Sequence, residues 1–144
     1  MNPFTDNFST DKKYMNEVSD TELKKVIADF LEQGHVENII AMYRHEPRYY
    51  EWTGEILDDE RFAVRIGVSV LFEELKKLEP EMTRRAIPSL TALLQSDSAN
   101  IRGEAVSVLG IIGGQEATDH IRAMAEDPNP QVREMVDLVL EELV

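Results

Sequence analysis

The stretch Asp97-Ser98-Ala99-Asn100-Ile101-Arg102-Gly103-Glu104-Ala105-Val106-Ser107-Val108-Leu109-Gly110 decides the fold, because its pattern occurs three times in the chain. Each copy combines an acidic residue, an aliphatic residue followed by arginine, and two later apolar residues. The other copies are Asp59, Val64-Arg65, Val68, Phe72 and Asp127, Val132-Arg133, Val136, Leu140. A pattern that recurs at this spacing is typical of stacked helix pairs, because one pair cannot bury its apolar faces without neighbours. The sequence therefore predicts a helical solenoid.

The helices that precede these copies also align. Tyr49, Ala86 and Ala117 correspond, so successive units are offset by 37 and 31 residues. We predict repeats at about residues 47–78, 83–113 and 115–144, preceded by N-terminal helices within 19–46. Ser19 is a predicted helix cap and Gly34 a predicted helix stop. Residues 1–18 lack helical periodicity and are predicted to be an N-terminal arm.

This pattern resembles the HEAT-repeat family, in particular the short prokaryotic variety called PBS-lyase-type HEAT-like repeats. The matching text runs from Ala86-Ile87-Pro88-Ser89-Leu90 to Ile112-Gly113, and again from Ala125-Glu126-Asp127-Pro128 to Arg133-Glu134. The resemblance covers about residues 49–144. It implies an all-α fold, a right-handed α–α superhelix whose units stack in order. The aromatic residues Tyr49, Tyr50 and Trp52 stand where the family has small residues, which indicates a capping repeat.

The composition restricts the function. The formal net charge is −13, which opposes binding to nucleic acid or to an anionic membrane. The sequence has no cysteine, which rules out disulfides and thiolate zinc sites. No apolar run approaches the roughly 20 residues of a membrane helix. These features predict a cytoplasmic protein with no membrane or nucleic-acid partner.

The aligned arginines and aspartates are predicted to be structural. In the resembled family, such positions form a ladder of hydrogen bonds between units. A guanidinium offers five donors, which suits carboxylates and loop carbonyls. We assign Arg65, Arg102, Arg133, Asp59, Asp97 and Asp127 to this ladder. Glu104 is predicted to lie on a helix surface.

The best candidate for a binding surface is the concave side, which the resemblance assigns to the second helix of each unit. Aligned positions predicted to be exposed there are Ile66, Ser69, Gly103, Val106, Glu134 and Asp137. The strip becomes acidic toward the C-terminus, which favours a basic protein or peptide partner. Tyr50 is a further candidate contact, because Tyr49, Trp52 and Thr53 follow the inward stripe.

Three functions were weighed. The preferred function is a non-enzymatic scaffold or adaptor for protein–protein interaction, with no catalytic residue, metal or cofactor. The first alternative is a bilin lyase-like protein or a subunit that assists an enzyme. The second is a DNA-binding repeat protein of the alkylation-repair type, which would need a basic strip. We predict a monomer, with a weak end-to-end dimer through Leu138 as the rival state.

Overall fold

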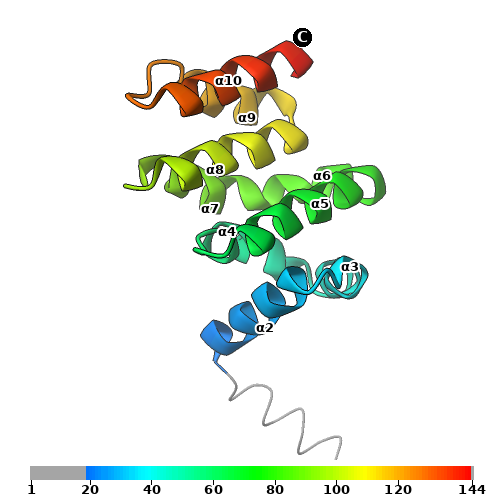
Figure 1. The fold of residues 1–144 in the computed structure, drawn as a ribbon. Helices are drawn as coiled ribbons and strands as arrows, with labels where there is room; N and C mark the ends of the chain where they lie inside the picture. The colour runs from blue at the N-terminus through cyan, green and yellow to red at the C-terminus, as the bar shows by residue number, and fades with distance from the viewer. Residues whose placement is uncertain (1–18, 144) are drawn as a thin grey trace, which may run out of the picture.

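The structure, a computed structural model, describes residues 19–143, and every regular element in that range is a helix. The predicted N-terminal arm lies outside the described residues. The elements stack in chain order into an all-α solenoid (Figure 1). In order they are α2 (Asp20–Glu32), α3 (Val36–His45), η1 (Pro47–Trp52), α4 (Thr53–Leu57), α5 (Phe62–Leu78), α6 (Pro80–Thr83), η2 (Arg84–Ala86), α7 (Ile87–Ala92), η3 (Leu93–Gln95), α8 (Ala99–Ile112), α9 (Gly114–Arg122) and α10 (Pro130–Leu143).

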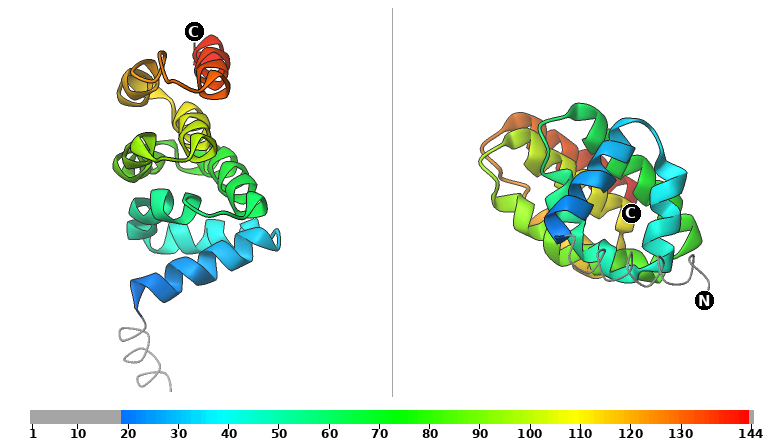
Figure 2. Two further views of the ribbon diagram at one scale, coloured as in Figure 1. Left: turned by 60° about the vertical axis from the view of Figure 1, so that its left-hand side comes forward. Right: turned by 90° about the horizontal axis from the view of Figure 1, so that it is seen from below.

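The helices form two layers. Figure 2 shows α5, α8 and α10 on one side of the stack and α4, α7 and α9 on the other. Each second helix packs on the second helix of the next unit, so α8 lies between α5 and α10. This order places one long helix from every unit on a common face.

The first helices of two units are short and interrupted, whereas the second helices are continuous. Pro47 begins η1 and Pro80 begins α6, positions at which a missing backbone amide costs little. The predicted repeats end at residue 78 and resume at residue 83, which leaves a connection between the units. There, Pro80–Thr83 forms a helical turn that opens the second unit.

The N-terminal helix pair closes one end of the stack. The Ser19 hydroxyl accepts the amide of Glu22 at 3.2 Å and caps α2. Gly34 has a φ of +83°, a left-handed conformation that favours glycine and ends the helix. Ile27 and Leu31 of α2 are buried, and the Leu31 Cβ lies so near Gly67 of α5 that a side chain there would clash.

The aromatic cluster belongs to the core. Tyr43, Tyr50 and Phe72 are fully buried and meet edge to face, with the Tyr43 and Tyr50 ring centroids 4.9 Å apart. Trp52 is buried beside Tyr49. These rings fill the junction between the N-terminal pair and α5, so they lie inside the stack, and the N-terminal pair, not the unit that contains Tyr49 and Trp52, covers this end (Figure 1).

Candidate functional site

The three aligned arginines share one contact. In each unit, the Nη1 atom donates to the carbonyl six residues earlier in the preceding loop. Arg65 donates to Asp59 at 2.9 Å, Arg102 to Ser96 at 2.8 Å, and Arg133 to Asp127 at 2.6 Å. This contact fixes the loop before each second helix to the first turns of that helix.

Of the three aligned arginines, only Arg102 also forms hydrogen bonds with the next unit within the part of the chain that the structure describes. Its Nε donates to Asp127 Oδ2 at 2.8 Å and its Nη2 to Oδ1 at 3.0 Å, a bidentate ion pair. Asp127 is buried and also accepts the amide of Asn129. The hydrogen bonds from Arg102 hold the pKa of the Asp127 carboxyl below its usual value. This pair locks α8 to the loop before α10.

The predicted aspartates do not all occupy the same place. Asp97 is exposed and makes no hydrogen bond through its side chain with the described residues, so its ladder assignment is wrong. Ser96 stands at the equivalent position. Its hydroxyl accepts the amide two residues later, as the carboxylates of Asp59 and Asp127 do. The sequence alignment paired Asp97 with Asp59 and Asp127 because Asp97 is acidic and directly follows Ser96, the residue that is equivalent in the structure.

Residues other than the predicted ladder aspartates cap two of the second helices. Ser98 caps α8 by accepting the amide of Ile101, and Asn129 accepts the amides of Gln131 and Val132 at the start of α10. The Asp59 carboxylate accepts a hydrogen bond from Arg61 of the same loop, and Arg61 also donates to Asp29 of α2. The carboxylates therefore order the loops, and only Asp127 joins two units through an aligned arginine.

The junction between α5 and α8 lacks the equivalent ion pair. Arg65 is buried, and its Nε has no hydrogen-bond partner in the part of the chain that the structure describes. A cleft of about 560 Å³ opens beside it between the Asp58–Glu60 loop and the start of α8. Glu104 faces this region. Burial raises the pKa of its carboxyl, and the positive charge of Arg65 opposes that shift. Glu104 is therefore partly buried, not on an open surface as expected.

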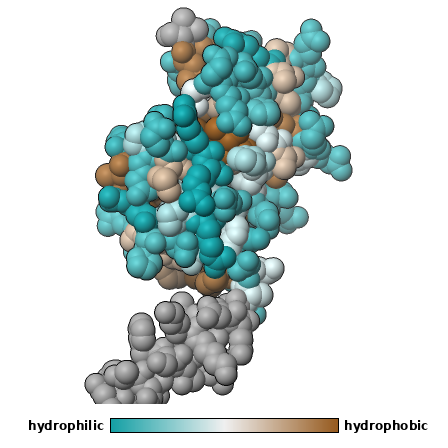
Figure 3. Space-filling model, turned by 180° about the vertical axis from the view of Figure 1, so that it is seen from behind, coloured by the Kyte–Doolittle hydropathy of each residue, from teal (hydrophilic) through white to brown (hydrophobic). Residues whose placement is uncertain are grey.

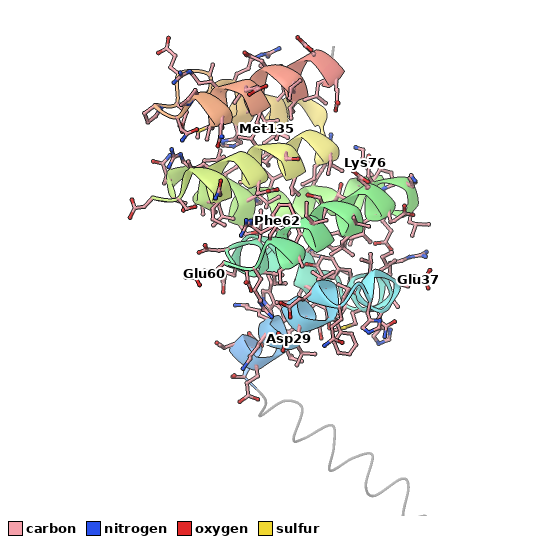
Figure 4. The ribbon with its side chains drawn as sticks, in the orientation of Figure 1. Asp29, Glu37, Glu60, Phe62, Lys76 and Met135 are labelled. Atoms are coloured by element: carbon pink, nitrogen blue, oxygen red, sulfur yellow. The ribbon has the colours of Figure 1, made fainter. Side chains whose placement is uncertain are left out.

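The second-helix face, formed by the outward residues of α5, α8 and α10, contains most of the predicted contact residues. Figure 4 shows this face, with Phe62 at the start of α5 and Met135 on α10. Ile66, Glu134 and Asp137 are exposed, and Ser69 and Gly103 are partly exposed. The opposite side is covered mostly by hydrophilic residues (Figure 3).

Two predicted contact residues are instead buried. Val106 is buried because α5 packs on one side of α8 and α10 on the other. More of the surface of α8 is therefore covered than in a helix with one neighbour. Tyr50 is also fully buried, and its hydroxyl donates to Glu79 at 2.8 Å. Pro47–Trp52 is a 3₁₀ helix with about three residues per turn, so the α-helical spacing used to place Tyr50 does not apply.

Sequence reasoning missed the main hydrophobic row on this face. Phe62, Ile66 and Val70 of α5 are 64%, 42% and 41% exposed. Their four-residue spacing places them on one side of the helix, beside the buried stripe of Val64, Val68 and Leu71. The four-residue spacing of Phe62, Ile66 and Val70 is visible in the sequence. Only Ile66 was predicted as a contact residue, because the prediction rested on positions aligned between the repeats.

The described residues provide little for metal chemistry or membrane insertion. Within residues 19–143, no group of three or more histidine, aspartate and glutamate side chains is placed to hold a metal ion. No helix in that range is long and apolar enough to cross a bilayer.

Helix pairs that stack in chain order, each with the same arginine contact inside the unit, define an α-solenoid protein. Comparison with family models gives the specific class: residues 50–141 match the model described as HEAT repeats, and the chain belongs to that family. Comparisons with curated proteins and with solved structures find no match. The family match supports the helical-repeat fold. HEAT repeats are generally scaffolds for protein–protein interaction.

Proposed function

We propose that this chain is a non-enzymatic scaffold that binds another polypeptide through its second-helix face. The observation that carries the proposal is the exposed row Phe62, Ile66 and Val70. Single exposed apolar residues are common, but a contiguous row of them is typical of an interaction site. Aromatic residues such as Phe62 are also enriched in interfaces.

The rigidity of the face supports the same proposal. The three second helices that form it are continuous, and their inner sides belong to one core. A preformed surface of this kind loses little conformational freedom when a partner binds. Within residues 19–143, no specific contact supports bilin chemistry or DNA binding. We therefore prefer the scaffold function to these two alternatives.

A peptide-display selection against the full chain tests the proposal. We expect selected peptides to bind the wild-type protein and to bind Ile66→Asp about tenfold more weakly. Leu78→Asp is the matched control, because Leu78 is a similarly exposed residue of α5 that lies outside the row of Phe62, Ile66 and Val70. Circular dichroism would verify that both variants remain helical. Selected peptides that bind wild type and Ile66→Asp equally would contradict the proposed face.

We further propose that the scaffold is a monomer. Leu138 of α10 is 50% exposed, but Glu134, Asp137, Glu141 and Glu142 surround it on the outer side of that helix. Like charges oppose the end-to-end contact of two copies. Sedimentation over a range of protein concentrations should give the monomer mass. A dimer that Leu138→Glu abolishes would overturn this proposal.

A further inference from the structure

Two hollows meet on the N-terminal half of the second-helix face. One, of about 490 Å³, lies between α5 and the end of α2, and its lining is mostly apolar. The other, of about 450 Å³, continues along the start of α3 and contains more polar side chains. Gly34, Val36 and Val70 line both. Together they form one groove, which we call the α2–α5 groove.

The apolar side of this groove has the length of a short helix contact. Phe62, Ile66 and Val70 occupy successive turns of α5, so the row extends about 12 Å at the usual rise of an α-helix. On the other side of the hollow, the partly exposed Val36 of α3 faces the row, and the buried Leu31 of α2 also lines the hollow. A helix from a partner could place its side chains between these two ridges, as packed helices do.

The backbone around the groove favours a helical occupant. From Ile66 to Val70 the backbone groups lie within α5 and are bonded inside that helix. In the facing turn, the Gly34 amide donates to Leu31 and the His35 amide to Phe30. An extended peptide buried here would leave its own amides and carbonyls without partners, whereas a helix satisfies them internally.

The charges around the groove favour a basic occupant. A third hollow, of about 320 Å³, continues the face from α5 across α8 to α10. The α2–α5 groove is lined by Glu32, Glu37 and Glu74, and the third hollow by Glu73 and Glu142, with no lysine or arginine in any of these linings. Glu32 pairs with Arg61 and Glu74 with Lys77. Glu37, Glu73 and Glu142 form no ion pair with any described side chain.

We infer that the α2–α5 groove binds an amphipathic, basic α-helix of a partner protein. This inference rests on the proposed scaffold function and names the chemistry of its partner. The apolar stripe of the partner helix packs on Phe62, Ile66 and Val70. Lysine or arginine residues beside that stripe face the glutamates that line this groove, Glu32, Glu37 and Glu74. These charges steer the encounter and fix the orientation.

Three synthetic peptides of about 18 residues, roughly five helical turns, test the inference with the full chain. The first carries a leucine stripe at helical spacing with lysines beside it. The second has a central proline, which breaks the helix. The third has glutamate in place of lysine. Isothermal titration calorimetry at physiological ionic strength should show that the first binds at least about tenfold more tightly than either control.

Two variants of the protein locate the binding. Ile66→Lys should weaken binding of the first peptide by about tenfold or more, whereas Leu78→Lys, with the same change of charge, should alter it by less than about twofold. Equal losses in both variants would mean general attraction to an acidic protein and would overturn the inference. So would equal binding of the proline or glutamate peptide.

The outcomes also separate this inference from the proposed function. If display selects acidic or extended peptides whose binding depends on Ile66, the basic-helix inference fails while the scaffold function stands. If no selected polypeptide depends on Ile66, both fail. Self-association through the groove, measured by sedimentation and lost in Ile66→Lys, would identify a second copy as the occupant and would likewise overturn the inference.

Discussion

The two junctions between second helices solve the same packing problem with different chemistry. At the α8–α10 junction, Arg102 and Asp127 form a buried bidentate pair. At the α5–α8 junction, Ser96 replaces the aspartate, the Arg65 Nε has no described partner, and a cleft remains. The α5–α8 junction is therefore held without that ion pair, by apolar packing and by a hydrogen bond from Lys76 of α5 to the Ile112 carbonyl of α8. The Arg102–Asp127 pair adds a bidentate contact to the α8–α10 junction.

Removal of Asp127 should have the largest effect on this comparison. Asp127→Ala leaves Arg102 without its bidentate partner and the Asn129 amide without its acceptor. We expect a loss of about 3 kcal/mol in the free energy of unfolding, as for other broken buried pairs. Urea denaturation measures it. Asp97→Ala is the control and should change stability by less than about 0.5 kcal/mol. Equal losses would restore the original assignment of Asp97 to the ladder.

Gly110 tests how tightly the locked junction is packed. A Cβ atom at this position would lie 2.4 Å from Val139 Cγ1 of α10. Because valine has few alternative rotamers in a helix, Gly110→Ala should cost about 1–3 kcal/mol. Gly103→Ala, in open space on the same helix, should instead stabilise by about 0.5–1 kcal/mol. Thermal melts followed by circular dichroism compare the two; opposite signs are the essential result.

Ser96→Asp should convert the open junction into a locked one. The new carboxylate would stand where Asp127 stands in the next unit and could accept from Arg65. We expect a gain of about 1 kcal/mol, because nearby acidic residues offset part of the attraction. Ser96→Asn keeps an acceptor without the charge and serves as the control in urea denaturation. If the two variants are equally stable, Arg65 does not use a carboxylate at this position.

Glu104→Gln tests whether the Glu104 carboxylate forms a stabilising interaction with Arg65. Burial raises the pKa of this carboxyl in the folded protein, so ionisation opposes folding. The stability that the group contributes is present below the ordinary pKa of 4.5 and is lost as pH rises through the folded value. We therefore expect Glu104→Gln to stabilise the protein at neutral pH by less than about 1 kcal/mol.

The pH dependence provides the check on this last prediction. The difference between Glu104→Gln and wild type should shrink as pH falls below 4.5, because the wild-type carboxyl is then protonated in both states. Denaturation curves at several pH values measure it. Destabilisation by Glu104→Gln at neutral pH would show instead that Glu104 is the partner of Arg65.

The sequence predicted the architecture well because repetition is a property of many residues at once. The aligned apolar positions and the arginines identified helix pairs, and small errors at single residues did not change the result. The family match and the all-helical fold confirm that prediction. The repeat limits agree less closely with the helices, because the second unit begins at Pro80.

The surface was harder to predict because it depends on how each helix is packed. Val106 follows the same alignment as Ser69 and Asp137, yet it is buried because α8 has neighbours on both sides. Tyr50 was misplaced because a 3₁₀ helix has a different period. The α2–α5 groove is formed by residues far apart in sequence, so only the folded chain brings Val36 to Val70.

The unequal junctions also divide the molecule into parts of different cooperativity. α8 packs more extensively on α10 than on α5, and the Arg102–Asp127 lock adds to that difference. Local unfolding should therefore separate a C-terminal block from an N-terminal block, with the boundary at the junction between α5 and α8. The inferred groove lies wholly within the N-terminal block. A bound helix should thus protect the amides of α2 and α5 from hydrogen exchange much more than those of α10.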